Sequence, residues 1–200
     1  MAIAASSCTA VILAGGISRR MGRCKALLPL DGQSMLLRTR NQLSDFDSVL
    51  LSCNDMQLAD GFRAVPDLFP DAGPLAGIHA SLLATDRPAI FVVPCDLPYF
   101  SGELPRLMLS AMDKDADVMV CRDGTGSIHP LCGIYRRRIL PELEACLRAG
   151  QHRIMDFVRR VSWQCLETGG LISDRVFFNM NTPADYRAVS AGADKGPGKQ

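Results

Sequence analysis

The segment 13–22 reads LAGGISRRMG and combines two adjacent glycines with several cations. Gly15 and Gly16 allow the backbone to approach a ligand closely and to point amide N–H groups at phosphate oxygens. Arg20 and Lys25 lie near these glycines, where clustered positive charges repel one another unless an anion neutralises them. The segment is neither a dinucleotide GxGxxG motif nor a Walker A loop. It therefore predicts a cradle for a small phosphorylated ligand; the alternative is a tight turn with solvated arginines.

A second candidate is Asp96, in the segment PCDLP at 94–98, which follows an apolar run. Beyond the end of a strand, its carboxylate would face the crevice in which doubly wound folds bind their ligands. A carboxylate there suits Mg²⁺, which usually takes one or two protein carboxylates together with substrate phosphates. The alternative is a turn former or helix cap, a common role for an aspartate close to a proline such as Pro98. Together, the glycine loop and Asp96 indicate metal-assisted chemistry at a phosphate.

Both candidates follow apolar runs that are too continuous for a sheet with one solvated face, so they favour a parallel sheet covered on both faces. The predicted strands are 9–13, 48–52, 90–93 and 118–120. Amphipathic helices are predicted between them at 34–43, 74–84 and 102–112. This alternation predicts an α/β fold, doubly wound around a mostly parallel, Rossmann-like central sheet.

The second half of the chain is less regular and predicts a small antiparallel excursion. Further strands are expected at 129–135, 163–166 and 176–178, and helices at 138–148 and 152–160. Thr182, Pro183 and Asp185 predict the start of a last helix. The length suits a single domain over 1–190, and the stretch 191–200, rich in Gly, Lys and Ala, is expected to be a disordered tail.

The bulk composition limits the classes of partner. The formal net charge is +1, which gives the whole molecule no strong field for nucleic acid. No stretch approaches the ~20 apolar residues of a membrane span, and the N-terminus lacks the basic region of a signal peptide. The eight cysteines are scattered singly, which is typical of free thiols in a reducing compartment. We therefore expect a cytoplasmic protein that binds neither nucleic acid nor membrane.

Five sequence blocks, taken in order, resemble those of the molybdenum cofactor guanylyltransferases, a family of nucleotidyltransferases. They are the LAGG, RMG and lysine of 13–25, GPLAGI at 73–78, PCDLP at 94–98, HP at 129–130 and NMNTPAD at 179–185. The resemblance implies a nucleotidyltransferase fold and a Mg²⁺-dependent enzyme. Its implied reaction transfers GMP from GTP to the terminal phosphate of molybdopterin, releasing pyrophosphate and forming the guanine dinucleotide cofactor. Its implied further partners are proteins that deliver the molybdenum cofactor and molybdoenzymes that receive it.

The resemblance also implies roles for individual residues. The implied catalytic residues, which neutralise and align two anions, are Lys25, Arg20 and Asp96. Asp96 is also the implied metal ligand. The residues implied on the molybdopterin side are His129, Asn179 and Asn181. The implied nucleotide-binding residues are Leu13, Ala14, Gly15, Gly16, Lys25, Asn54, Asp67, Gly73, Pro74, Gly77 and Asp96.

Several alternatives stay open. His129, read on its own, is a general base or a structural histidine. Either Ser52 or Asn54 is the nucleotide contact after the strand at 48–52. The family's lysine follows an acidic residue, whereas Arg and Cys at 23–24 precede Lys25, which leaves the partner of Lys25 undetermined. The alternative functions are a cytidylyltransferase acting on molybdopterin or another small phosphorylated substrate, or a non-catalytic nucleotide-sensing domain.

Overall fold

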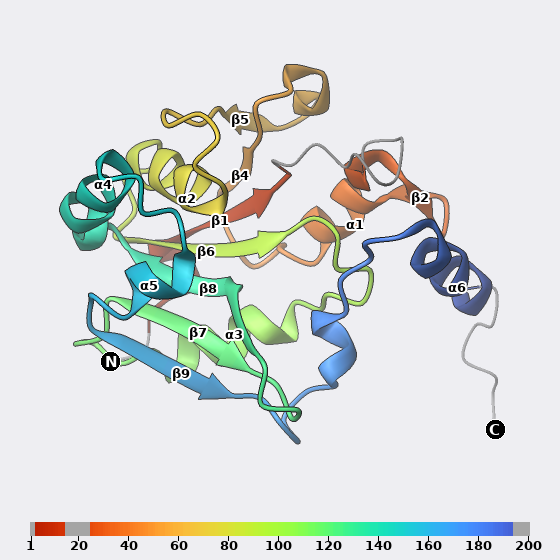
Figure 1. The fold of residues 1–200 in the computed structure, drawn as a ribbon. Helices are drawn as coiled ribbons and strands as arrows, with labels where there is room; N and C mark the ends of the chain where they lie inside the picture. Colours follow the sequence, from red (N-terminus) through yellow and green to blue (C-terminus); the bar gives the residue numbers. More distant parts are fainter. Residues whose placement is uncertain (1–2, 15–24, 194–200) are drawn as a thin grey trace.

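The computed structural model describes residues 3–14 and 25–193, and its centre is a seven-stranded sheet (Figure 1). The strands are β1 (Cys8–Leu13), β4 (Val49–Ser52), β5 (Arg63–Val65), β6 (Ala89–Pro94), β7 (Val118–Arg122), β8 (Ile128–Arg136) and β9 (Trp163–Glu167). Their order across the sheet is β5-β4-β1-β6-β8-β7-β9. Of these strands, β8 alone runs antiparallel to its neighbours β6 and β7. The predicted doubly wound α/β fold with a mostly parallel sheet and an antiparallel excursion is thus confirmed.

A small two-stranded sheet, β2 (Pro29–Leu30) and β3 (Gln33–Ser34), lies outside the central sheet. Asp31 and Gly32 form its turn, with φ angles of 51° and 76°. Positive φ at both central residues is the geometry that Asp-Gly turns adopt in tight hairpins. Ser34 then caps helix α1 (Met35–Asn41), because its hydroxyl accepts a hydrogen bond from the amide of Leu37.

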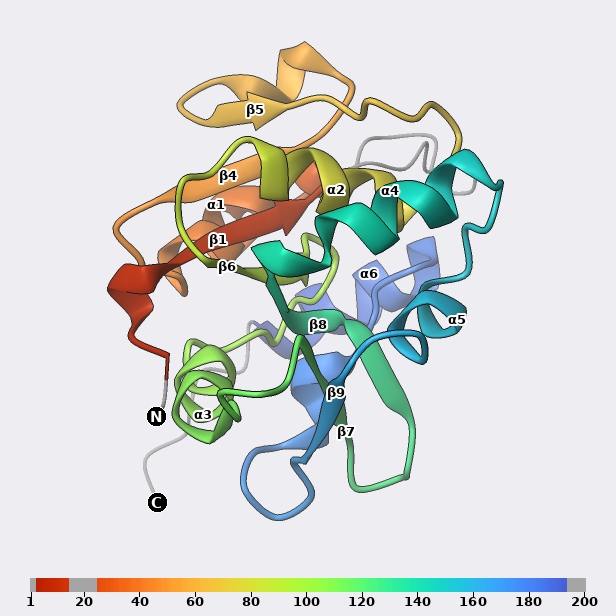
Figure 2. The same ribbon diagram turned by 90° about the vertical axis from the view of Figure 1, so that its left-hand side faces the viewer.

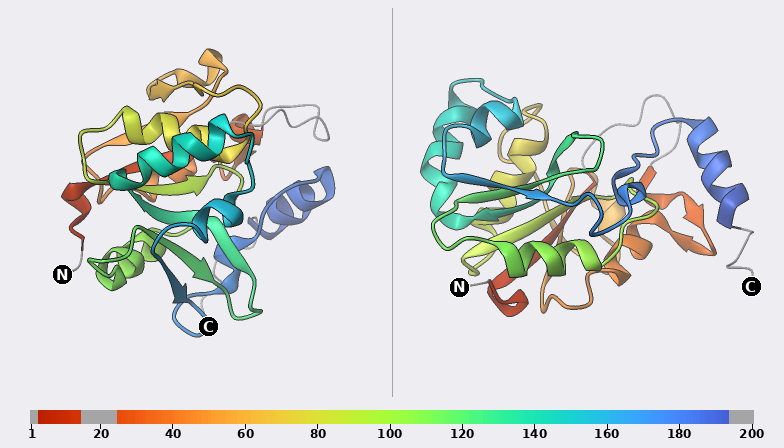
Figure 3. Two further views of the ribbon diagram at one scale, coloured as in Figure 1. Left: turned by 60° about the vertical axis from the view of Figure 1, so that its left-hand side comes forward. Right: turned by 90° about the horizontal axis from the view of Figure 1, so that it is seen from below.

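Helices cover both faces of the central sheet (Figure 2). On one face α1 and α3 (Glu103–Ala111) pack against β1 and β6. On the other face lie α2 (Pro74–Leu83), α4 (Leu140–Arg148) and α5 (Ile154–Val158). The last helix, α6 (Pro183–Ala193), stands apart from the central sheet (Figure 3). Its Val189 packs in a small apolar cluster with Leu30 of the β2–β3 hairpin. The short 3-10 helices are η1 (Ala5–Ser7), η2 (Lys25–Leu27), η3 (Met56–Ala59), η4 (Arg137–Ile139) and η5 (Asp174–Phe177).

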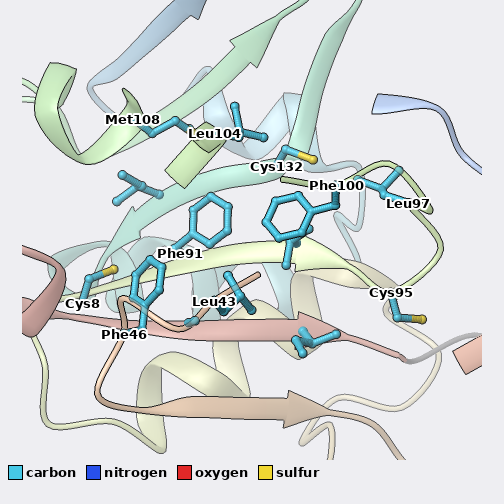
Figure 4. Packing of buried hydrophobic residues seen from close by; sticks show 14 of the residues in the cluster. Cys8, Leu43, Phe46, Phe91, Cys95, Leu97, Phe100, Leu104, Met108 and Cys132 are labelled. Atoms are coloured by element: carbon cyan, nitrogen blue, oxygen red, sulfur yellow. The ribbon is translucent and has the colours of Figure 1, made fainter. Parts of the chain in front are cut away.

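Alternate residues of each central strand enter two separate apolar layers, which is why the strands read as continuous apolar runs. In β6, Phe91 and Val93 belong to the layer under α1 and α3, whereas Ile90 and Val92 belong to the layer under α2 and α4. Phe91 stands at the middle of the first layer between Phe46 and Phe100, with ring centroids 5.8 and 6.2 Å away (Figure 4). This stacked trio anchors the face of the sheet opposite α2.

Two predicted elements need correction. The segment 176–178 is not a strand, because the hydroxyl of Ser173 accepts a hydrogen bond from the Arg175 amide and starts the 3-10 helix η5. The helix predicted at 152–160 is shorter, since α5 spans only Ile154–Val158. Helix α6 extends to Ala193, so the first three residues of the predicted tail are helical, and 194–200 lie outside the described residues.

Candidate active site

The carboxyl ends of three adjacent parallel strands meet at one edge of the sheet, where the predicted site residues gather. Leu13, which ends β1, pairs with Ser52 of β4 on one side and with Pro94 of β6 on the other. Its carbonyl accepts a hydrogen bond from the Cys95 amide at 3.1 Å, and the amide of Ala14 donates to the Ser52 carbonyl at 2.9 Å. The start of the glycine loop is therefore tied to both neighbouring strands. Its continuation, with Gly15, Gly16 and Arg20, lies outside the described residues.

Lys25, Asp96 and Asn181 converge at this edge from distant parts of the chain. The Lys25 ammonium donates to Asp96 Oδ2 at 3.1 Å and to Asn181 Oδ1 at 2.7 Å. The Lys25 and Asp96 side chains are only 16% and 17% exposed, so water screens their attraction less than it would at an open surface. The partners of Lys25, which the sequence left undetermined, are thus Asp96 and Asn181.

The Asp96 carboxylate has one oxygen to spare for a ligand. Its Oδ1 is buried and has no hydrogen-bond partner among the described residues, whereas Oδ2 accepts from Lys25. A buried oxygen without a partner is costly unless a ligand or solvent satisfies it. No cluster of three or more His, Cys, Asp or Glu side chains able to hold a metal occurs within the described ranges. The donor set therefore fits a magnesium ion that takes a single protein carboxylate and completes its shell with phosphate and water oxygens.

Asp185 orders the segment that carries Asn181. One of its carboxylate oxygens, Oδ2, accepts hydrogen bonds from the amides of Asn181 and Thr182 at 2.9 and 2.8 Å. The Thr182 hydroxyl in return accepts from the Asp185 amide at 3.1 Å, which is the reciprocal pattern of a capping box. These hydrogen bonds, chiefly those with Thr182, lower the pKa of Asp185 and keep it ionised. The Met180 amide also donates to the Asp96 carbonyl, so this segment is joined directly to the Asp96 loop.

On the other side of β1 lie the residues predicted to bind the nucleotide. Asn54 donates through Nδ2 to Asp67 Oδ2 at 2.9 Å and accepts from the Asp67 amide at 2.8 Å. Asn54 is exposed, whereas Ser52 is only 3% exposed and faces Gly77 of α2. Asn54 is therefore the more accessible of the two open candidates.

Helix α2 begins beside these residues. Gly73, with φ of +67°, precedes the helix, and Pro74 occupies its first turn. A Cβ atom on Gly77 would overlap the Ser52 hydroxyl and lie 3.2 Å from Leu13 Cδ2, so only glycine allows α2 to lie this close to the ends of β4 and β1. The amide-rich start of α2 thereby faces the same edge as Lys25 and Asp96.

His129 lies in the wall of a cavity of about 590 Å³, and Lys25 and Asp96 are not among the residues that line it. Its Nε2 is 2.7 Å from Asp123 Oδ2, and its ring stacks on Phe177 with centroids 4.1 Å apart and planes 6° from parallel. The other Asp123 oxygen accepts from Thr125 and Ser127. These hydrogen bonds, first the one from Thr125, hold the pKa of Asp123 well below its usual range. Asn179 is exposed.

Apart from His129, the residues that build this cavity were not predicted from the sequence. Asp123 had a readable signal, because an aspartate followed by Thr125 and Ser127 is a pattern in which the carboxylate binds nearby backbone amides. Phe177 had none, because its ring meets His129 only through the tertiary fold. The buried His79 of α2 was also missed: it is 2% exposed, neither ring nitrogen has a hydrogen-bond partner among the described residues, and burial lowers its pKa.

Comparisons with known proteins identify a family that this chain matches. Residues 10–165 match the family model described as the MobA-like NTP transferase domain. The chain is 39% identical over 184 residues to a Pelotomaculum thermopropionicum protein named "Probable molybdenum cofactor guanylyltransferase", covering 88% of this chain and 89% of that protein. It is 36% identical over 183 residues to the molybdenum cofactor guanylyltransferase of Vibrio atlanticus, covering 88% and 91%.

The fold has close counterparts among solved structures. One is the crystal structure of molybdopterin-guanine dinucleotide biosynthesis protein A from Archaeoglobus fulgidus, with a TM-score of 0.77, 23% identity, and coverage of 94% of this chain and all of that one. At this identity the likeness concerns the fold alone. Among the helices of the described ranges, none has both the length and the apolar character needed to cross a membrane.

Proposed function

Because the chain belongs to the MobA-like NTP transferase family, we propose that it transfers GMP from GTP to the terminal phosphate of molybdopterin, releasing pyrophosphate. The names of its relatives supply the two substrates. The observation that carries the proposal is the Lys25–Asp96 pair, which stands at the carboxyl ends of the parallel strands, with Lys25 shortly after the glycine loop in the sequence. In the cell, the reaction would take place in the cytoplasm, where the thiols of the seven cysteines in the described ranges stay reduced.

In this reaction an oxygen of the molybdopterin phosphate attacks the α-phosphorus of GTP, and the bond from that phosphorus to the bridging oxygen of the β-phosphate breaks. The attacking phosphate is already an anion, so no general base is needed, and the site must instead bring two anions together. The Lys25 ammonium supplies a positive charge, and its bonds to Asp96 and Asn181 hold it in place. Arg20 is proposed to act beside it on the phosphates.

We assign the metal to Asp96. A bound Mg²⁺ would neutralise charge on the phosphates and orient them for in-line displacement. Asp96 Oδ1 is the atom that would hold it, since Oδ2 is occupied by Lys25.

The nucleotide is proposed to lie on the β4 side, over the glycine loop and the start of α2. The Asn54–Asp67 pair would accept the donor hydrogens of the guanine or ribose, because a carboxylate is an acceptor and guanine offers N1–H and N2–H₂ on one edge. Gly73 and Pro74 would present the start of α2 to the nucleotide, and Gly77 would keep this helix close to the ends of β4 and β1.

The test is pyrophosphate release by the full chain with molybdopterin and GTP or CTP, in the presence and absence of Mg²⁺. We expect release with GTP, loss of activity on chelation and recovery on addition of Mg²⁺. Asp96→Asn should raise the Mg²⁺ concentration needed for half activity, with Asp86→Asn, an exposed site, as the matched control. A higher kcat/KM with CTP would make the protein a cytidylyltransferase, and GTP binding without release under any condition would favour a nucleotide sensor.

A further inference from the structure

The cavity around His129 is lined in part by the two chain segments that carry Asp96 and Asn181. Tyr99, in its wall, comes three residues after Asp96, and Phe178, also in its wall, comes three residues before Asn181. Both segments are tied together by the bond from the Met180 amide to the Asp96 carbonyl. The sheet order places this cavity on the β8–β7 side of β1, whereas the proposed nucleotide residues lie on the β4–β5 side. The cavity is therefore available to the second substrate.

The walls of the cavity present flat, polarisable surfaces. His129 stacks on Phe177, and Asp123 fixes its imidazole through Nε2. On another wall the Arg175 guanidinium lies over the Tyr99 ring, 4.1 Å from its centroid, and Phe178 packs at a tilt against the same ring. Ordered rings and a stacked guanidinium are the surfaces on which planar heterocycles bind in proteins.

The polar groups of the cavity are of two kinds. Both carboxylate oxygens of Asp123 already accept hydrogen bonds within the protein, from Thr125, Ser127 and His129, so Asp123 is not available to a ligand. Asp174 gives only Oδ1 to a neighbour, the Gly124 amide at 2.9 Å, so its other oxygen remains as an acceptor within the described part of the molecule. Arg175 supplies N–H donors. A ligand with two N–H donors on one edge and a carbonyl oxygen nearby would form hydrogen bonds with both Asp174 and Arg175.

We propose, on the basis of the proposed function, that this cavity binds the pterin ring system of molybdopterin, with Phe177 and His129 as its stacking wall and Asp174 and Arg175 as its polar contacts. The 2-amino-4-oxo edge of a pterin carries N–H donors that suit a carboxylate and an oxygen that suits a guanidinium. A volume of about 590 Å³ lies in the ordinary range of small-molecule sites. His129 is then a binding residue and not a general base.

The experiment measures binding of 6-hydroxymethylpterin to the full chain by quenching of pterin fluorescence, without GTP, together with the KM for molybdopterin and for GTP in transfer. Phe177→Leu keeps an apolar group in a buried position and removes the ring, and we expect it to weaken pterin binding about five- to hundredfold. Asp174→Asn should weaken binding about tenfold, because it replaces a charged acceptor by a donor. His129→Ala is paired with His152→Ala, an exposed histidine outside the cavity, as the control.

The expected pattern is a raised KM for molybdopterin, an unchanged KM for GTP and an unchanged Tm for Asp174→Asn. Variants with a wild-type KM for molybdopterin would overturn the proposal, even if the wild-type chain performs the transfer. Displacement of the pterin by GTP, with a raised KM for GTP in the variants, would also overturn it and would make the cavity a base site. Pterin binding that the variants weaken, in a chain that releases no pyrophosphate, would support the cavity assignment and count against the proposed function.

Discussion

Gly77 lies in α2 where this helix crosses the end of β4, and its replacement by alanine tests how closely the two are packed. The new Cβ atom would overlap the Ser52 hydroxyl and lie 3.2 Å from Leu13 Cδ2. Overpacking costs about 1–3 kcal/mol, whereas alanine in place of glycine within a helix gains about 1 kcal/mol. For Gly77→Ala alone we expect a net loss of about 1 kcal/mol of unfolding free energy, which lowers Tm by about 2–4 °C for a chain of this size.

Ser52→Ala provides the matched background, since it removes the hydroxyl and leaves the Ser52 Cβ position 3.5 Å from the new atom. In that background Gly77→Ala should be neutral or stabilising, because the helix gain remains, the overlap with the hydroxyl is gone, and the remaining close approach is to the end of the flexible Leu13 side chain. A double-mutant cycle measured by urea unfolding should therefore give a coupling energy of about 1–2 kcal/mol. Equal effects of Gly77→Ala in the two backgrounds, within about 0.5 kcal/mol, would refute the reasoning.

Three other predictions concern the site, a buried histidine and the core. Lys25→Met should lower kcat about hundredfold or more, because the positive charge that stabilises the transition state is lost. Lys114→Met, at an exposed lysine, should leave kcat unchanged. Equal effects of the two substitutions on kcat would show that Lys25 has no catalytic role. Burial lowers the pKa of His79 below its ordinary value of 6.5, so its neutral form stabilises the fold above about pH 6.5 and this contribution is lost as the pH falls toward the folded pKa. His79→Phe should flatten this part of the pH dependence measured by urea unfolding between pH 7.5 and 5.5, and an unchanged slope would contradict it. Phe91→Ala should cost about 3–5 kcal/mol in urea unfolding, whereas Leu83→Ala, at an exposed position, should cost little; a loss below about 1 kcal/mol for Phe91→Ala would show that the stacked trio does not anchor the core.

The central strands were predictable from the sequence because both of their faces are buried. Residues 90–93 are apolar without interruption, and the structure sends alternate members of this run into two different layers. The run at 176–178 is also apolar, but no strand of the described ranges pairs with it, and the Ser173 cap starts a 3-10 helix there instead. Three apolar residues do not distinguish these outcomes. The β2–β3 hairpin does have a sequence signal, the Asp31-Gly32 pair between Leu30 and Gln33, which is typical of a two-residue hairpin turn.

The position of a site residue could be predicted from the sequence only where that residue lies close to the end of a predicted strand. Asp96 comes two residues after the end of β6, so its position could be predicted from the strand alone. The contact of Lys25 with Asn181 joins residues 156 positions apart, and no local pattern specifies it. The cavity likewise needs Tyr99, His129 and Phe177 from three separate segments, which only the tertiary fold brings together.

The capping box at Thr182 and Asp185 sets the order in which the site can be completed during synthesis. The strands up to β9 can pair once residue 167 has left the ribosome, because every strand of the central sheet is then present. Lys25 and Asp96 still lack Asn181 at that moment, and the cap that orders Asn181 needs Asp185. A nascent chain therefore contains every strand of the central sheet before Lys25 has its Asn181 partner. A chain truncated before residue 181 would lack this partner of the Lys25 ammonium.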